Sequence, residues 1–205
     1  MLTESQEARF EAALRNAEEF FMGKAKVQRA LAELARTLDE LEIPYAIAGA
    51  MALNAYGYER VTTDVDVILT SEGLAALKAR KLGRGYLERF PGGRSLRDTA
   101  LGVDIDVLIT GEYPGDGKPK PIAFPDPATA EGGAGYRLVS LPKLVELKLA
   151  SGMTAPHRLK DLADVLELIR AAKLPLSFEE SLHPYVREKY RELHQTAQGS
   201  TGDQR

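Results

Sequence analysis

The sequence contains no cysteine, and this absence excludes several classes of protein at once. Without thiols there is no disulfide scaffold, no cysteine nucleophile and no zinc site built on cysteine. Long apolar stretches are missing too, because the longest uninterrupted run, Tyr45 to Leu53, has nine residues, whereas a membrane-spanning helix needs about 20. The opening MLTESQEARF lacks the charged-then-apolar pattern of a signal peptide. We therefore expect a cytoplasmic protein with no membrane partner.

Several familiar catalytic motifs are also absent. The chain has no Gly-x-Ser-x-Gly elbow, no Walker loop and no dinucleotide-binding glycine fingerprint. His157, His183 and His194 have neither metal-binding spacing nor an obvious nucleophile partner. The net charge of −3 argues against a protein that clamps nucleic acid over its whole surface.

What is present fits one domain with helical additions. The 205 residues are 44% hydrophobic and 28% charged, which supplies enough apolar material for one core. Hydrophobic periodicity predicts a chain that contains both helices and strands, of the α/β (α+β) class. The predicted divisions are N-terminal helices over 1–42, a sheet-containing core over 43–140, C-terminal helices packed on that core over 141–195, and a disordered tail over 196–205.

Two predicted strands carry the same acidic pattern. The first, Val61 to Leu69, contains Asp64 and Asp66, and the second, Val103 to Ile109, contains the pair Asp104 and Asp106. Because side chains alternate along a strand, the two carboxylates of each pair share one face and the branched apolar residues share the other. If the strands are neighbours, up to four carboxylates converge, and Mg²⁺ is their natural partner. The alternative is that both strands present an ordinary solvated face.

Two weaker signals also concern phosphate. Gly49 stands between a predicted strand and a helix that starts at Ala50, where bare backbone N–H groups favour an anion; a simple tight turn explains it equally well. Lys148 falls inside the apolar stripe of the helix that follows Ser140, so it must either snorkel to solvent or find an anion. A carboxylate–metal–triphosphate site would supply that anion.

Two other charged segments have plain alternatives. On the predicted helix over 157–173, Lys160, Asp161 and Asp164 lie away from the leucines, which is typical of a solvated face. The segment over 78–97 holds seven lysines or arginines against one acid, Glu88. It could hold a triphosphate or an RNA acceptor, or it could be a solvated helix and hairpin.

The stretch AIAGAMALNAYGYERVTTDVDVILT resembles the signature of the nucleotidyltransferase superfamily typified by DNA polymerase beta. That signature is a strand, a glycine with a small residue, a helix, an Asp-x-Asp strand and a third aspartate on a later strand. Gly49 and Ala50 match the first element, Asp64 and Asp66 the second, and Asp106 the third. Asp106 is preferred to its neighbour two residues earlier because it directly precedes the apolar exit Val-Leu, as in family members.

The downstream segment LVSLPKLVELKLASGMTAPHRLKDLADVLELI is similar to the abortive-infection (AbiEii) type of nucleotidyltransferase. In that type, a lysine helix and a basic-Asp helix pack beside the catalytic sheet. Lys148, Lys160, Asp161 and Asp164 are the matching positions. One departure concerns Ala50, which stands where the family usually has serine or glycine and offers no hydroxyl to a phosphate.

The resemblance implies the nucleotidyltransferase fold, a small mixed sheet flanked by helices with N- and C-terminal helical additions. It also implies transfer of an NMP group from an NTP to a hydroxyl acceptor. The implied acceptor is an RNA 3′ end or a protein, with a small hydroxylated molecule also open, and the implied setting is a toxin with a cognate antitoxin. Two Mg²⁺ ions are expected, with Mn²⁺ as a substitute. The implied catalytic residues are Asp64, Asp66, Asp106 and Lys148, of which the three aspartates hold metal. The implied nucleotide-binding residues are Gly49, Ala50, Arg60, Lys148, Lys160, Asp161 and Asp164.

Two rival interpretations stay open at this point. One is a non-catalytic nucleotide- or partner-binding module on the same fold, which Ala50 supports. The other is a helical interaction protein whose acidic strands are merely solvated. A nucleotide-binding module predicts a thermal shift with Mg²⁺ and nucleotide, and only the enzyme also releases pyrophosphate.

Overall fold

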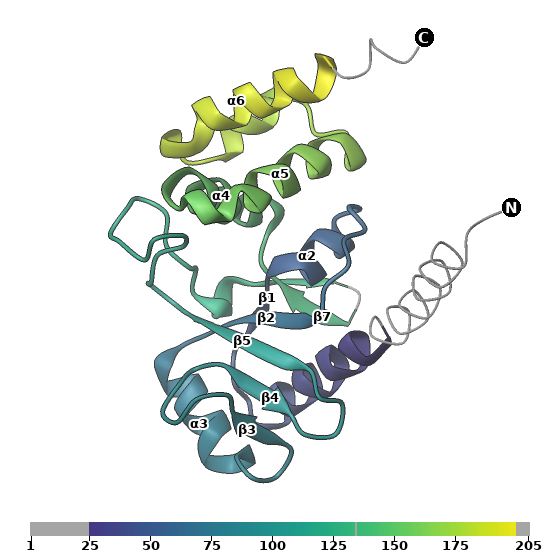
Figure 1. Ribbon diagram of the computed structural model, residues 1–205, viewed down its shortest axis with the longest axis vertical. Coiled ribbons are helices and arrows are strands. Elements are labelled where there is room, and N and C mark those ends of the chain that lie inside the picture. Colours follow the sequence, from purple (N-terminus) through teal and green to yellow (C-terminus); the bar gives the residue numbers. More distant parts are fainter. Residues whose placement is uncertain (1–24, 134, 200–205) are drawn as a thin grey trace, which may run out of the picture.

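A mixed sheet of seven strands forms the middle layer of the protein (Figure 1). The computed structural model describes residues 25–133 and 135–199. In chain order the strands are β1 (Ala46–Ile47), β2 (Asp64–Leu69), β3 (Tyr86–Glu88), β4 (Leu96–Asp98), β5 (Asp104–Ile109), β6 (Glu131–Gly133) and β7 (Tyr136–Leu138). Their order across the sheet is β3-β4-β5-β2-β1-β7-β6. The neighbours β2 and β5 are parallel, as are β1 and β7, and the remaining pairs are antiparallel.

Helices cover both faces of this sheet. A helix over 25–40 precedes the first strand. The later α-helices are α2 (Gly49–Ala55), α3 (Ser71–Lys81), α4 (Leu141–Thr154), α5 (Leu159–Ala171) and α6 (Pro184–Gly199). Short 3₁₀ turns are η1 (Pro127–Thr129), η2 (Pro156–Arg158) and η3 (Leu176–Ser181). The expected fold class, a mixed sheet flanked by helices, is confirmed.

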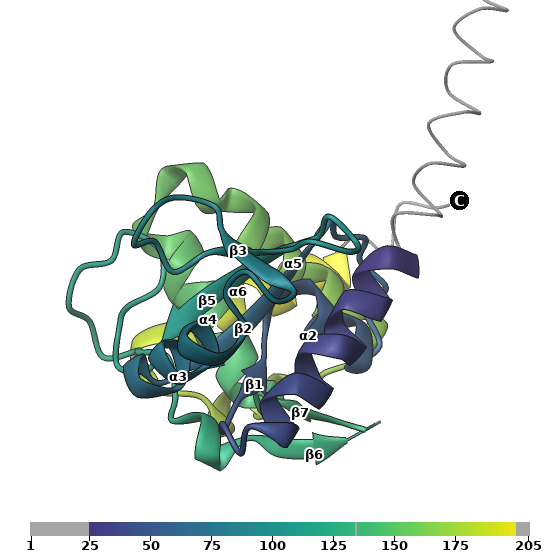
Figure 2. The ribbon, with the colours of Figure 1, turned by 90° about the horizontal axis from the view of Figure 1, so that it is seen from below.

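The alternation along β2 and β5 divides the apolar core into two. Val65 and Val67 on β2, with Ile105 and Val107 on β5, are buried against the helix over 25–40 and against α3. Figure 2 views the molecule from this side, where that helix and α3 lie across the sheet. The intervening aspartates of both strands consequently face the opposite layer.

The opposite layer consists of α2 and the bundle of α4, α5 and α6. A second apolar cluster joins Ile68 and Ala46 of the sheet to these helices. α4 lies in the middle of this layer and is buried almost all round from Leu144 to Gly152. A lysine on such a helix cannot reach solvent easily, which matters for the site below.

Short elements and element ends differ from the sequence-based expectation. β4 and β6 have three residues each, and neither was predicted, because such short strands are stabilised by their neighbours rather than by a pattern of their own. The C-terminal helices were expected to end at residue 195, but α6 runs from Pro184 to Gly199 after the 3₁₀ turn η3. It thus continues four residues into the predicted disordered tail. Residues 1–24 and 200–205 lie outside the described residues.

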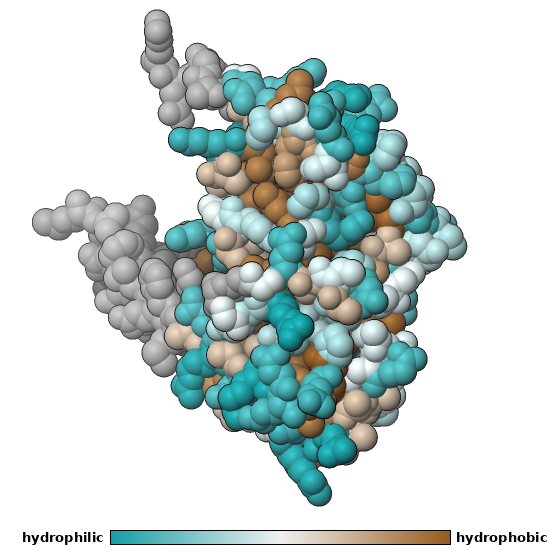
Figure 3. Space-filling view, turned by 180° about the vertical axis from the view of Figure 1, so that it is seen from behind, coloured by the Kyte–Doolittle hydropathy of each residue, from teal (hydrophilic) through white to brown (hydrophobic). Residues whose placement is uncertain are grey.

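The surface is mainly hydrophilic. Figure 3 shows the back of the molecule, where hydrophobic residues come to the surface chiefly in the upper, helical half. Large hydrophobic side chains that are more than one-third exposed are spread over several elements: Val61, Leu87, Phe90, Met153, Leu159 and Leu176. Over the described residues, no helix is both long and apolar enough to cross a membrane.

Candidate functional site

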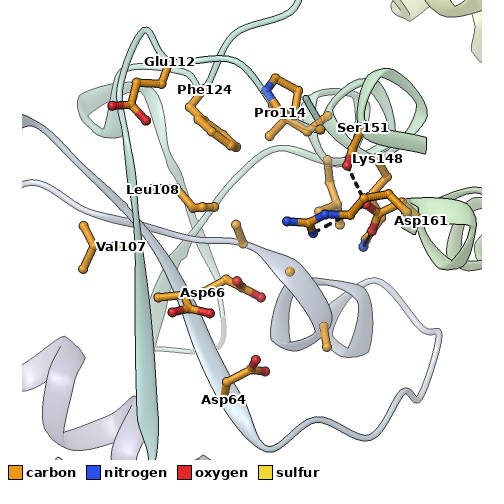
Figure 4. Close-up of a pocket in the computed structure, with 18 of the residues that line it drawn as sticks. Asp64, Asp66, Val107, Leu108, Glu112, Pro114, Phe124, Lys148, Ser151 and Asp161 are labelled. Carbon is orange, nitrogen blue, oxygen red and sulfur yellow. Dashed lines mark hydrogen bonds and ion pairs between the residues drawn. The ribbon is translucent and has the colours of Figure 1, made fainter. Parts of the chain in front are cut away.

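A cavity of about 820 Å³ lies between the sheet and the helical layer. One wall carries carboxylates from β2 and β5, and the other carries side chains from α4 and α5 (Figure 4). The residues expected from the sequence that line it are Gly49, Ala50, Arg60, Asp64, Asp66, Asp106, Lys148, Lys160 and Asp161. The structure therefore brings together most of a set that is spread over more than 100 positions of the chain.

On the sheet wall, the two acidic strands are direct parallel neighbours. Asp64 pairs in register with Asp104, and Asp66 with Asp106. The expectation that the two strands adjoin is confirmed. The possible convergence of all four carboxylates is not, because Asp104 does not line the cavity. Its carboxylate is held instead by two arginines, as described below.

The three remaining carboxylates have little positive charge around them. The Thr62 hydroxyl donates to Asp64, and the Ser95 hydroxyl donates to Asp106 Oδ1 at 2.8 Å. Within the described residues, none of Asp64, Asp66 and Asp106 forms an ion pair. Hydroxyl groups orient a carboxylate but do not neutralise it, so this wall of the cavity keeps its negative charge.

The pKa of Asp66 is raised in this environment. Burial at the bottom of the cavity, together with the neighbouring Asp64 and Asp106 carboxylates, raises the pKa of Asp66 to about 6, although Lys148 and Arg158 act in the opposite direction. A carboxylate in this situation gains from any cation that enters the cavity.

Gly49 allows the backbone to approach Asp66 closely. Its φ of +58° lies in the left-handed region, and a Cβ at this position would collide with the Asp66 carboxylate. The Ala48 N–H donates to the Asp66 carbonyl at 3.0 Å, which fixes the strand-to-helix turn beside β2. The glycine is therefore required for contact with Asp66. The neighbouring Ala50 is buried and presents only a methyl group.

On the helical wall, Lys148 is buried and paired with aspartates of its own chain. Its Nζ lies 3.0 Å from Asp161 Oδ1 and 2.7 Å from Asp164 Oδ2. Arg60 shares the second carboxylate, with Nη1 2.7 Å from Asp164 Oδ2. The expectation that this lysine snorkels or finds an anion is thus resolved: it finds an anion, supplied by α5.

The expectation of a solvated face on α5 was wrong for two of its three residues. Asp161 and Asp164 are 7% and 3% exposed, because α4 packs on α5 along that face, and only Lys160 is exposed. Asp164 does not line the cavity, but it holds Lys148 and Arg60, which do. The apolar stripe of α5 did not reveal that the face with Asp161 and Asp164 is packed as well.

Asp161 shows how pairing changes a buried carboxylate. Burial by itself would raise its pKa, but the charge of Lys148, hydrogen bonds from Ser151 and Lys148, and the charge of Arg158 together lower the pKa of Asp161 below its usual value. The Ser151 Oγ donates to Asp161 Oδ2 at 2.6 Å. This carboxylate is ionised and fully satisfied, unlike Asp66 across the cavity.

Sequence reasoning missed several residues of the cavity. Ser95 and Arg94 come from the β3–β4 connection, Arg158 from η2, and Glu112 and Phe124 from the long loop after β5. None of these positions belongs to a recognisable motif. The role of Ser95 can be inferred only when the strand pairing is known. The segment 95–97 then runs antiparallel to 104–106, which places Ser95 opposite Asp106.

The basic segment over 78–97 is largely neutralised in the fold. Lys78 Nζ lies 2.7 Å from Glu88 Oε1, and Arg94 pairs with Glu112. Of the seven cations in the segment, Arg94 alone lines the described cavity. These ion pairs weaken the case for a broad basic RNA-binding surface that the composition of this segment suggested.

The chemistry of the sheet wall fits a divalent cation, although its side chains do not form a closed ligand set as they stand. Carboxylate oxygens are the ligands that Mg²⁺ prefers, and Asp66 lacks a cationic partner. Yet across the described residues, no group of three or more histidines, cysteines, aspartates or glutamates is arranged to hold a metal ion. Side-chain rotation on β2 and β5 would be needed to close such a set.

Comparison with known proteins gives a likeness in fold. No family model matches the sequence, and no curated protein matches it. Among solved structures, the solution structure of the antibiotic-resistance factor ANT(2'')-Ia has a TM-score of 0.51 and 16% identity, covering 89% of this chain and 98% of that one. The likeness shows that this chain shares the fold of that factor, which is nucleotidyltransferase-like.

A second structure of the same factor agrees. The crystal structure of ANT(2'')-Ia in complex with adenylyl-2''-tobramycin has a TM-score of 0.50 and 16% identity, covering 85% of this chain and 98% of that one. At this identity the likeness concerns the nucleotidyltransferase fold alone, and it does not distinguish the AbiEii type expected from the sequence.

Proposed function

We propose that the protein is a metal-dependent nucleotidyltransferase that moves an NMP group from an NTP to a hydroxyl acceptor. The observation that carries the proposal is the sheet wall of the cavity: Asp64, Asp66 and Asp106 face it from two parallel strands, and none of them is ion-paired within the described part of the chain. The fold shared with ANT(2'')-Ia supports the same interpretation.

These three aspartates would hold the metal ions, Mg²⁺ or Mn²⁺. When bound, the ions would neutralise charge on the phosphate oxygens. The physical reason for this assignment is compensation of the negative sheet wall. Asp66 forms no ion pair among the described residues, and burial together with the neighbouring carboxylates raises its pKa to about 6.

The chain's own residues would then orient the reactants. Asp106 would accept the proton of the acceptor hydroxyl. The acceptor oxygen would bond to the α-phosphorus as the bond from that phosphorus to the bridging oxygen breaks, and pyrophosphate would leave. Charge on the leaving group would face Lys148, Arg60 and the more exposed Lys160 on the helical wall. Gly49 would let the backbone lie close to Asp66 without a side-chain clash, and Ala50 would offer backbone contacts without a hydroxyl.

Asp161 and Asp164 would act on the nucleotide through the cations that they hold. Their contacts to Lys148 and Arg60 fix the positions of both side chains. Nucleotide binding would therefore depend on these carboxylates although one of them lies outside the cavity. This assignment refines the expectation that both contact the nucleotide.

The acceptor is tested directly by following a labelled nucleotide. Purified protein is incubated with each α-³²P nucleoside triphosphate, Mg²⁺ and, separately, total RNA, total protein or a panel of small polyhydroxylated amines that includes tobramycin. Label that appears on one of these and is absent with Asp66→Ala supports transfer and identifies the acceptor class. Binding of nucleotide without transfer to any acceptor, and without pyrophosphate release, would support the non-catalytic module instead.

Two observations favour different acceptors. The complex of ANT(2'')-Ia with adenylyl-2''-tobramycin favours a small hydroxylated molecule. The resemblance to the AbiEii type favours RNA or protein, in a toxin controlled by a cognate antitoxin. Expression of the wild type and of Asp66→Ala in a bacterial host separates the two, because a toxin arrests growth only when the site is intact.

A further inference from the structure

β4 and the residue directly before it place one side chain opposite each aspartate of β5. The two strands are antiparallel, with Leu96 facing Ile105 and Arg97 facing Asp104. One residue further along the same register, Ser95 lies opposite Asp106. Both contacts are made: Arg97 Nη1 lies 2.8 Å from Asp104 Oδ1, and Ser95 Oγ lies 2.8 Å from Asp106 Oδ1.

The two contacts differ in charge. Asp104 receives Arg97 and also Arg89, whose Nη1 lies 3.2 Å from its Oδ2, so both of its oxygens face a cation. Asp106 receives a neutral hydroxyl on one oxygen. Among the described residues, its second oxygen has no hydrogen-bond partner. Two aspartates of one strand therefore differ in availability, and only Asp106 lines the cavity.

The connection that carries Ser95 is held in place by further bonds. The Arg89 N–H donates to the Ser95 carbonyl at 3.0 Å and closes the β3–β4 hairpin. Glu88 accepts the Gly92 N–H at 2.8 Å and pairs with Lys78 at 2.7 Å. A side chain on a braced hairpin can fix its partner's rotamer, because little of its own freedom remains to be lost.

We propose that Ser95 is a positioning residue for Asp106, holding its carboxylate toward the cavity without neutralising it, while Arg97 and Arg89 remove Asp104 from the site. The proposal rests on the proposed function insofar as Asp106 takes part in the transfer step. It also explains from the fold why two identical residues on β5 differ in role.

The reaction step gives Ser95 a specific kinetic signature. Asp106 acts on the acceptor hydroxyl, whereas the nucleotide meets the helical wall and the β2 aspartates. Loss of orientation at Asp106 therefore lowers kcat more than it raises KM for the nucleotide. Removal of a hydrogen bond to a carboxylate should lower kcat by about tenfold or more.

The experiment compares Ser95→Ala and Ser95→Thr in the full chain. The matched control is Thr99→Ala, which removes a hydroxyl that bonds to Gly85 at the other end of the same hairpin. The expected result is a fall in kcat of about tenfold for Ser95→Ala with little change in KM, near-normal kcat for Ser95→Thr, and no change for Thr99→Ala.

A second measurement does not depend on activity. Three-bond couplings to the β-protons of Asp106, measured by NMR on metal-free protein, report its χ1 distribution. One dominant rotamer is expected in the wild type, in Ser95→Thr and in Thr99→Ala, with averaging in Ser95→Ala. If the Asp106 couplings are the same in Ser95→Ala and the wild type, the proposal is overturned.

The two measurements also separate this proposal from the proposed function. Averaged couplings in Ser95→Ala together with no nucleotidyl transfer by the wild type would overturn the function and retain the positioning. An active enzyme in which Ser95→Ala raises KM and leaves kcat unchanged would overturn the positioning and retain the function.

Discussion

The two walls of the cavity carry carboxylates of the same kind in opposite electrostatic states. On the sheet wall, Asp66 lies among other carboxylates, and its pKa is raised to about 6. On the helical wall, Asp161 lies against Lys148 and Ser151, and its pKa is lowered. Burial by itself raises the pKa of both carboxyl groups, so the opposite directions come from their partners. An acidic residue that lacks a cationic partner is a place where a cation can bind. An acidic residue that is already paired contributes to the stability of the fold instead.

The largest effect should separate two aspartates of one strand. Asp106→Asn should lower nucleotidyl transfer by about a thousandfold, since its charge is free to act in the reaction. Asp104→Asn removes a partly exposed carboxylate that is already paired with Arg97 and Arg89, and should change activity by less than about threefold. Transfer of ³²P label measures both. Equal losses in the two variants would refute the distinction drawn here.

The second effect concerns the ion cluster of Lys148, Asp161 and Asp164 on the helical wall. Lys148→Met would leave Asp161 and Asp164 buried with less compensation, and should lower the free energy of unfolding by about 3 kcal/mol. Lys160→Met is the matched control, because that lysine is exposed and 12 residues away on the next helix. Urea unfolding followed by circular dichroism measures both changes. A difference below about 1 kcal/mol between the variants would mean that the ion cluster contributes little to stability.

A third change tests the close approach on the sheet wall. Gly49→Ala introduces a methyl group into the space of the Asp66 carboxylate. Gly57→Ala also has a positive φ, +96°, but its added Cβ would meet nothing within 4 Å. Gly49→Ala should therefore lose about 2 kcal/mol more stability than Gly57→Ala, and should bind divalent cations more weakly in calorimetry. Similar losses in both variants would assign the cost to backbone strain alone.

The smallest effect is a pH dependence of the metal-free protein. The folded pKa of Asp66, about 6, is above its ordinary value of 3.8, so between these values the folded state binds more protons than the unfolded state. Stability should therefore rise, by on the order of 2 kcal/mol, as pH falls from 7 toward 4.5.

Chemical denaturation in the presence of a chelator, at half-unit pH intervals, checks this sign. Asp66→Asn should flatten the curve in that window, because the titrating group is gone. Mg²⁺ should flatten it as well by stabilising the ionised form. A wild-type curve that falls as pH decreases from 7 to 5 would show that other carboxylates dominate.

Local patterns in the sequence were sufficient for the acidic strands. Alternation on β2 and β5 predicted that Asp64 and Asp66 share a face and that Val65 and Val67 face the core, and both hold because a strand has a fixed period of two. The position of Lys148 in the apolar stripe of α4 also indicated that this lysine must either snorkel to solvent or find an anion. These inferences depend only on residues close together in the chain.

Partners across the fold could not be found in this way. Asp161 and Asp164 were expected to be solvated, since nothing in their own helix shows that α4 packs on that face. The family resemblance favoured Asp106 over Asp104, but the contacts that distinguish them depend on the register of β4, a three-residue strand that no pattern predicts.

The sequence by itself therefore determined the class of fold, the acidic strands and the choice at Lys148 between snorkelling and an anion, because each follows from short-range periodicity and from the cost of burying charge. Only the tertiary structure decided which carboxylates are paired and which stay available. That decision depends on side chains brought together across the sheet and between helices: arginines opposite Asp104, a serine opposite Asp106, and a lysine between Asp161 and Asp164.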